Sequence, residues 1–308
     1  MKKDSNFEEL DEICNMIEIT TVRHILEIYP QFLKNKTNIS FNFFEKNSLN
    51  AYAKYDYYND TYEIYLGKKL ISELRNISLN IINNVSDDKD ISHMTRNELS
   101  KLEDSIFYFW IHFICHHEWF HIARGHLNYG SKNIDKCFKI NELQTNDYTK
   151  NNNIGLCFEI DADRYAWKFV FGSFIMTVDN LEKELNLTVD VLLKFFIKSM
   201  MYIFDLFVDL GGNNRGTEHP APSERMIITI MSIQEAIHIK PEILEKFDMN
   251  EETFIMMSTT LLREHFKNHE LKYKLDIDKL IFTSQLWDDY IQTLKNMKLD
   301  EYQLLREF

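Results

Sequence analysis

Two histidines and a glutamate lie within five residues in the stretch His117-Glu118-Trp119-Phe120-His121. Apolar spacing predicts one helix over roughly residues 96–127, and on a helix residues four apart share a face, with Cβ atoms about 5–6 Å apart. His117 and His121 can therefore bind one metal ion together. Glu118 lies beside that face, where it could take a proton from a water on the ion. The motif favours a zinc hydrolase. Because the same pattern also arises by chance, the residues outside it must show whether a metal site is present.

A catalytic zinc site normally takes three protein ligands and leaves one position for water. Glu159 and Asp163 lie four residues apart on a predicted helix near residues 155–176, so both face the same way. One carboxylate could bind the metal while the other accepts the ring N–H of a ligand histidine. A solvated acidic first turn, favoured by the helix dipole, would explain the same pair without any metal.

The two motifs together, H-E-x-x-H and the later Glu159-Ile160-Asp161-Ala162-Asp163, resemble those of gluzincin metallopeptidases of the HtpX and CAAX-prenyl-protease type. In that family the glutamate of E-x-x-A-D is the third zinc ligand and the aspartate supports the site. The resemblance therefore implies Glu159 as a ligand and Asp163 as a supporting residue. It also implies a zinc-dependent endopeptidase with one Zn²⁺ per chain and Glu118 as general base.

Further segments match the family in its order and extend the resemblance over roughly residues 50–226. Upstream, Asn50, Ala51, Tyr52 and Ala53 are similar to its Asn-Ala-Phe-Ala segment, which implies substrate binding there. Downstream, His219-Pro220 followed by Arg225 is similar to its His-Pro…Arg element, and His126 matches a frequent Gly-His.

These matches imply roles for the downstream residues. His219 would assist the oxyanion, and Arg225 would pair with Asp163 or Glu159. Without the resemblance, His219 would be interpreted as an exposed loop histidine.

Residues 50–67 predict a β-hairpin, because two runs rich in aromatic and β-branched residues flank an Asn-Asp turn. Peptidases often bind substrate as an extra strand on an exposed sheet edge. If Thr61–Leu66 lies along the cleft, the substrate would be an extended polypeptide. A hairpin that only covers the core is an equally good interpretation.

The rest of the chain predicts an α+β fold that is predominantly α-helical. A small antiparallel hairpin or sheet would pack beside the motif helix. We expect N-terminal helices over residues 1–37, a zincin-like domain over 38–226 and a helical extension over 227–308 packed on it. Further helices are expected at 6–35, 68–85 and 187–210, and an exposed polar insertion at 129–153.

Composition excludes several classes of protein. The net charge of −13 and the lack of a basic stripe argue against phosphate-mediated nucleic-acid binding. The apolar run Val191–Leu210 carries too many charges for a membrane span. Four cysteines without paired spacing and an N-terminus without a signal-peptide core favour a reducing cytoplasm.

Two other functions stay open. The zinc could stabilise a non-catalytic binding or regulatory protein, in which case a fourth side chain such as His126 or Asp163 would close the site. The size and expected compartment are also similar to those of phage-exclusion peptidases of the Lit type, a resemblance that implies a latent defence or toxin peptidase.

The other histidines and aspartates are not expected to bind the metal. His112 and His116 are expected to pack in the core or to support the ligands from behind. Asp205 is expected on a polar helix face, and His265 and His269 are interpreted as having no metal spacing.

Overall fold

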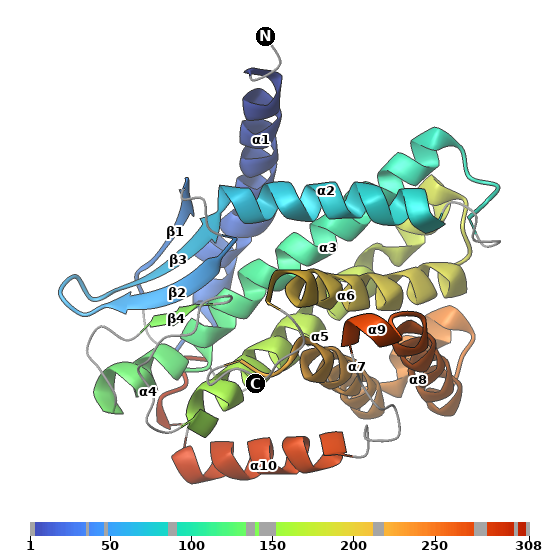
Figure 1. Cartoon of the computed structure of the whole chain (residues 1–308). Coiled ribbons are helices and arrows are strands. Elements are labelled where there is room, and N and C mark those ends of the chain that lie inside the picture. The colour runs from blue at the N-terminus through green and yellow to red at the C-terminus, as the bar shows by residue number, and fades with distance from the viewer. Residues whose placement is uncertain are drawn as a thin grey trace.

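The computed structural model describes residues 4–34, 37–45, 49–85, 91–133, 139–141, 152–211, 219–273, 282–298 and 301–305. Helices dominate, and a small four-stranded mixed sheet lies at one end of the molecule (Figure 1). The predicted α+β, predominantly helical class is confirmed. One hydrophobic core includes residues from all three predicted segments, such as Ile17, Ile64 and Phe266.

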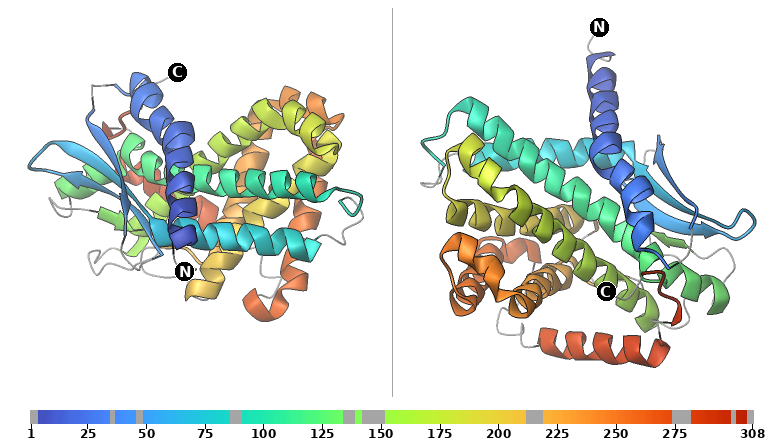
Figure 2. Two further views of the ribbon diagram at one scale, coloured as in Figure 1. Left: turned by 90° about the horizontal axis from the view of Figure 1, so that it is seen from above. Right: turned by 180° about the vertical axis from the view of Figure 1, so that it is seen from behind.

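The N-terminal segment is helical, as predicted. Helix α1 (Asp4–Ile17) projects from the body of the protein in two opposite views (Figures 1 and 2). It continues through π-helical turns at Glu18–Val22 and His24–Ile28, and a 3₁₀ turn at Tyr29–Phe32 ends it.

The sheet has the strand order β1-β3-β2-β4. The predicted hairpin is present: β2 (Ala51–Asp56) pairs antiparallel with β3 (Thr61–Gly67) around a turn in which Asp60 has φ 50°. Strand β1 (Ile39–Phe44) differs from the antiparallel expectation, since it runs parallel to β3. The hairpin folds back so that its second strand lies against β1, an arrangement that local sequence does not specify.

Helix α2 (Lys68–Val85) follows the sheet with the predicted bounds, and α3 (Arg96–Ala123) carries the histidine motif. A capping box begins α3: the Thr95 hydroxyl accepts from the Glu98 N–H while the Glu98 carboxylate accepts from the Thr95 N–H. From Ile106 onward nearly every residue of α3 is buried, as expected for a helix that is apolar all round.

The remaining described helices pack on α3 or on one another. Helix α5 (Asn152–Leu185) packs along it, and α6 (Val189–Gly211) packs against α5. The others follow in chain order: α7 (Pro222–Ile239), a 3₁₀ helix at Pro241–Phe247, α8 (Glu251–Asn268), α9 (Glu270–Tyr273) and α10 (Phe282–Met297). Helix α10 lies on the side of the molecule opposite α2 (Figure 1).

Helix α5 is longer than predicted, because buried Leu185 and partly buried Leu181 continue its apolar face beyond residue 176. The predicted insertion at 129–153 is only partly described. Residues 126–133 form α4 (His126–Asn133) and 139–141 form β4 (Lys139–Asn141), while 134–138 and 142–151 lie outside the described residues.

The motif helix ends four residues earlier than predicted, and Gly125 explains why. Its φ of +80° lies in the left-handed region, which favours glycine. A Cβ on Gly125 would come within 2.2 Å of the Tyr302 carbonyl oxygen. Beside this turn, the backbone N–H groups of Leu304 and Leu305 donate to the Ala123 carbonyl, at 2.9 and 3.2 Å. The break redirects the chain into α4.

None of the described helices is long and apolar enough to cross a bilayer. Cys14, Cys115 and Cys157 are buried thiols, and Cys137 lies outside the described part of the chain.

Two glycines give a matched test of the turn. Gly125→Ala should lower the free energy of unfolding by more than about 1 kcal/mol, because the new Cβ meets backbone at a positive φ. Gly172→Ala, in the middle of α5 with no atom within 4 Å of the added Cβ, should raise it by about 0.4–1 kcal/mol. Urea denaturation measures both, and equal effects would contradict the close approach at Gly125.

Candidate metal centre

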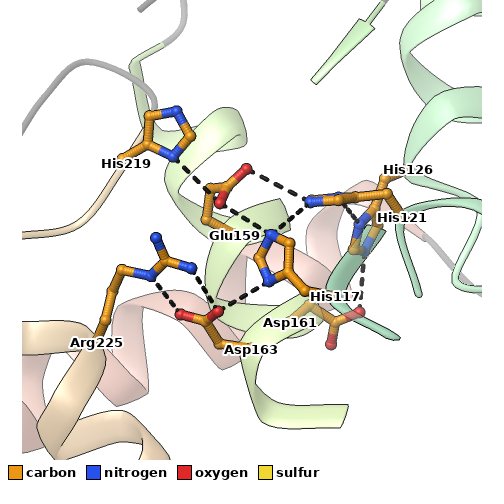
Figure 3. Close-up of polar contacts among 8 residues, drawn as sticks. All are labelled: His117, His121, His126, Glu159, Asp161, Asp163, His219 and Arg225. Atoms are coloured by element: carbon orange, nitrogen blue, oxygen red, sulfur yellow. Dashed lines mark hydrogen bonds and ion pairs between the residues drawn. The ribbon is translucent and has the colours of Figure 1, made fainter. Parts of the chain in front are cut away.

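Helices α3 and α5 bring the two motifs together in the buried interior (Figure 3). The Nε2 atoms of His117 and His121 are 3.0 Å apart. The carboxylate of Glu159 faces both, with its oxygens 3.3 Å from the His117 Nε2 and 3.5 Å from the His121 Nε2. All three residues are at most 1% exposed. This group could hold a metal ion.

The Nδ1 atom of His117, the outer ring nitrogen that faces away from the centre, has a partner of its own. Its Nδ1 lies 2.9 Å from Asp163 Oδ1, and Arg225 on the first turn of α7 binds the same carboxylate through two contacts of 2.7 Å. An ionised carboxylate only accepts, so Nδ1 carries the proton and Nε2 presents its lone pair to the centre. The structure thus pairs Arg225 with Asp163, one of its two expected partners.

The outer ring nitrogen of His121 is held through a second histidine. His121 Nδ1 lies 2.9 Å from His126 Nδ1, and His126 Nε2 lies 3.0 Å from Asp161 Oδ2. The carboxylate accepts from His126, which in turn accepts from His121, so the His121 Nε2 lone pair also faces the centre. Both histidines of the motif are therefore fixed in the tautomer that binds a metal through Nε2.

Asp161 had no predicted role, although it stands between two residues that did. Arg124 Nε donates to Asp161 Oδ2 at 2.8 Å, and the Tyr290 hydroxyl donates to Asp161 Oδ1 at 2.7 Å. Arg124 also binds Gln303 of the C-terminal segment. The only sequence signal was a third acidic residue within E-x-D-x-D, and its partners lie up to 129 residues away.

The neutral imidazole of His121 and the ionised carboxylates of Glu159 and Asp161 favour a bound cation. Burial lowers the pKa of His121 well below its ordinary value, which keeps the ring neutral. Burial alone would raise the pKa of Glu159, but the imidazoles of His219 and His117 hold it well below the usual range. Burial likewise opposes ionisation of Asp161, yet Arg124 and His126 keep the pKa of that carboxyl low.

The donor set fits a zinc-sized ion. Bonds of about 2.0–2.1 Å in a tetrahedron place ligand atoms roughly 3.3–3.4 Å apart. The two Nε2 atoms are 3.0 Å apart, and each lies close to one oxygen of Glu159, His117 at 3.3 Å from Oε2 and His121 at 3.5 Å from Oε1. Two imidazole lone pairs facing each other at 3.0 Å repel unless a cation or proton lies between them. His126 and Asp163, the expected candidates for a fourth ligand, both contact outer Nδ1 atoms and so lie away from the centre.

His219 contacts the centre through Glu159, and Glu118 is buried next to His117 on α3. His219, just before α7, places Nδ1 3.1 Å from Glu159 Oε2, and its side chain is 14% exposed (Figure 3). It is therefore part of the site and not an exposed loop histidine. Glu118 is 1% exposed on α3, next to His117.

The predicted substrate-binding segment lies in the interior of the sheet. Asn50, Ala51 and Ala53 are buried, and Tyr52 stacks on Tyr65 at 4.7 Å between ring centroids. Thr61–Leu66 does not offer the exposed edge that the first interpretation of the hairpin requires, because β3 lies between β1 and β2. Strand β2 is also covered, since β4 pairs with it from Tyr52 to Lys54. The backbone groups of an inner strand are already used by its neighbours.

His112 and His116 are buried packing residues, as predicted. The His116 ring contacts the Tyr29 hydroxyl at 3.0 Å, and burial lowers the pKa of His116 to about 4.

Asp205, His265 and His269, which the sequence did not assign to a metal, form a second group able to hold one. The expectation that His265 and His269 have no metal spacing is wrong, because they are four residues apart and lie together with Asp205.

Comparisons of the chain with protein-family models, with curated proteins and with solved structures find no match.

Asp161→Asn tests whether the His121–His126–Asp161 chain supports metal binding. Losing the anionic acceptor should weaken Zn²⁺ binding by about 10–100-fold, because histidine orientation and basicity depend on such partners. Competition with a chromophoric chelator measures the affinity. Asp179→Asn, on the same helix but in an exposed pair with Lys246, is the matched control and should bind as the wild type does. Equal affinity in both variants would contradict the supporting role of Asp161.

Proposed function

We propose that the protein is a zinc-dependent endopeptidase, a relative of the gluzincins of the HtpX and CAAX-prenyl-protease type. The observation that carries the proposal is the convergence of His117, His121 and Glu159 on one buried point, with both histidines held in the metal-binding tautomer. Zn²⁺ bound there would acidify a water and polarise a substrate carbonyl. The motif order along the chain supports the same assignment.

Glu118 is the proposed general base. Its carboxylate takes a proton from the attacking water and passes it to the leaving amine. A metal site that served only to hold the fold together would have no need of a buried acid next to its first ligand. His219 is the proposed oxyanion partner, because its imidazole reaches Glu159 from the side opposite α3 and remains partly exposed.

The position of possible fourth ligands favours catalysis over a purely structural zinc. Structural sites are normally closed by four protein ligands. Within the described residues, the group of mutually close ligand atoms contains three side chains only. His126 and Asp163 are engaged with outer ring nitrogens, where they orient ligands and do not close the site. A position for water therefore remains in the proposed centre.

The proposed substrate is an extended polypeptide. Strand addition requires an outer strand, and in the described sheet the outer strands are β1 and β4. Strand β4 contacts α4, the helix that begins with His126 of the centre. We therefore assign substrate pairing to the outer side of β4, in place of the inner strand suggested by the sequence.

Glu118→Gln tests the mechanism. The amide keeps the size of the side chain but cannot accept the proton, so peptide hydrolysis should fall by at least about 10²–10⁴-fold. Zinc content should stay at the wild-type value, since Glu118 is not a ligand. The measurements are metal analysis, cleavage of an unfolded fluorescent protein, and a proteome-wide search for new N-termini.

Glu184→Gln, an exposed change on α5, serves as the control and should cleave as the wild type does. Undiminished cleavage by Glu118→Gln would reject the assigned base. Zinc binding without hydrolysis by the wild-type protein on any substrate would favour the non-catalytic alternative.

A further inference from the structure

A second group of possible ligands lies among the C-terminal helices. Asp205 comes from α6, His265 from the last turn of α8, and His269 from the residue that ends α8. Each offers one ligand atom, and these atoms all lie within 4.8 Å of one another. The group combines two imidazoles with one carboxylate, a donor set that suits divalent transition ions.

The spacing of the two histidines is the same as in the motif of α3. His265 and His269 are four residues apart, and their ring centroids are 4.4 Å apart. His269 Nδ1 lies 2.9 Å from the His265 carbonyl oxygen, so Nδ1 donates and Nε2 keeps its lone pair for a ligand. A backbone carbonyl is a common orienting partner of metal-binding histidines.

The carboxylate of Asp205 already lies close to the ring of His265. His265 Nε2 lies 3.1 Å from Asp205 Oδ1, close to the roughly 3.3–3.4 Å between two ligand atoms of a tetrahedral zinc site. An ion bound here would replace the proton that now joins them. The Tyr273 hydroxyl donates to the same carboxylate and holds its orientation.

Burial and charge favour a bound cation. Asp205 and His265 are 8% and 7% exposed, whereas His269 is only partly buried and leaves a route of entry. Lys272, a lysine whose charge acts on Asp205, is 2.8 Å from Asp209 and paired with it. The carboxylate of Asp205 therefore contributes a negative charge to the group.

We propose that Asp205, His265 and His269 form a second site for a divalent transition-metal ion, with Zn²⁺ as its best-fitting probe. This site is separate from the proposed catalytic centre, since it shares no residue with it and draws on α6 and α8 in place of α3 and α5. An ion held there ties the C-terminal part of α6 to the end of α8. The chain then continues through α9, so the ion also fixes the start of the segment that leads towards α10.

Zinc content of a single variant tests the proposal. Metal-stripped protein is dialysed against excess Zn²⁺, and bound zinc is measured by plasma mass spectrometry. His269→Gln should hold one zinc per chain fewer than the wild type, whatever the centre on α3 holds. The matched control is His238→Gln, an exposed histidine in an ion pair with Glu251, which should hold the wild-type amount.

A measurement on the wild-type protein avoids any effect of mutation on folding. Zn²⁺ should slow the modification of His269 by diethyl pyrocarbonate at least 10-fold, as read by peptide mass spectrometry, and leave His238 unaffected. Equal zinc in His269→Gln and wild type would overturn the proposal and leave only a hydrogen-bonded Asp–His–Tyr cluster. Unchanged modification of His269 in saturating Zn²⁺ would overturn it as well. Failure of the catalytic proposal changes neither readout, because neither depends on hydrolysis.

Discussion

Three carboxylates of α5 are buried almost completely, and much of the surrounding structure serves to balance them. Glu159, Asp161 and Asp163 are exposed by 1% or less. An unpaired ion in such a place costs several kcal/mol, so each needs an opposite charge or good donors. Arg225 meets Asp163 and Arg124 meets Asp161, which leaves the charge of Glu159 to be balanced at the centre itself.

This constraint explains the positions of elements that are distant in sequence. Helix α7 begins where Arg225 can reach Asp163, and the break at Gly125 turns the chain so that His126 reaches Asp161. Helix α10 adds Tyr290 to the same carboxylate. The segments expected to form an N-terminal part, a central domain and an extension therefore share one core, and the centre draws residues from two of them.

Local sequence pattern was enough to predict most helices and strands, and the two histidines and the acidic pair of the candidate centre. The spacing of His117 and His121, and the acidic pair on α5, depend only on helical periodicity, which a sequence displays directly. The parallel pairing of β1, the early end of α3 and the role of Asp161 depend on contacts between distant residues, which periodicity does not encode. The contact between Asp205 and His265 could not be predicted for the same reason, because the two residues are 60 positions apart in the sequence.

The end of α3 depends on residues that are synthesised much later. Arg124 and Gln303, 179 residues apart, are joined beside the Ala123 carbonyl, which accepts from Leu304 and Leu305. Contacts of such long sequence separation carry a high loop-closure entropy and form slowly. A nascent chain that has just emerged with both motifs therefore lacks a finished helix end behind His121. The last turn of α3 reaches its final form only after residues 303–305 have been made and have docked beside the Ala123 carbonyl.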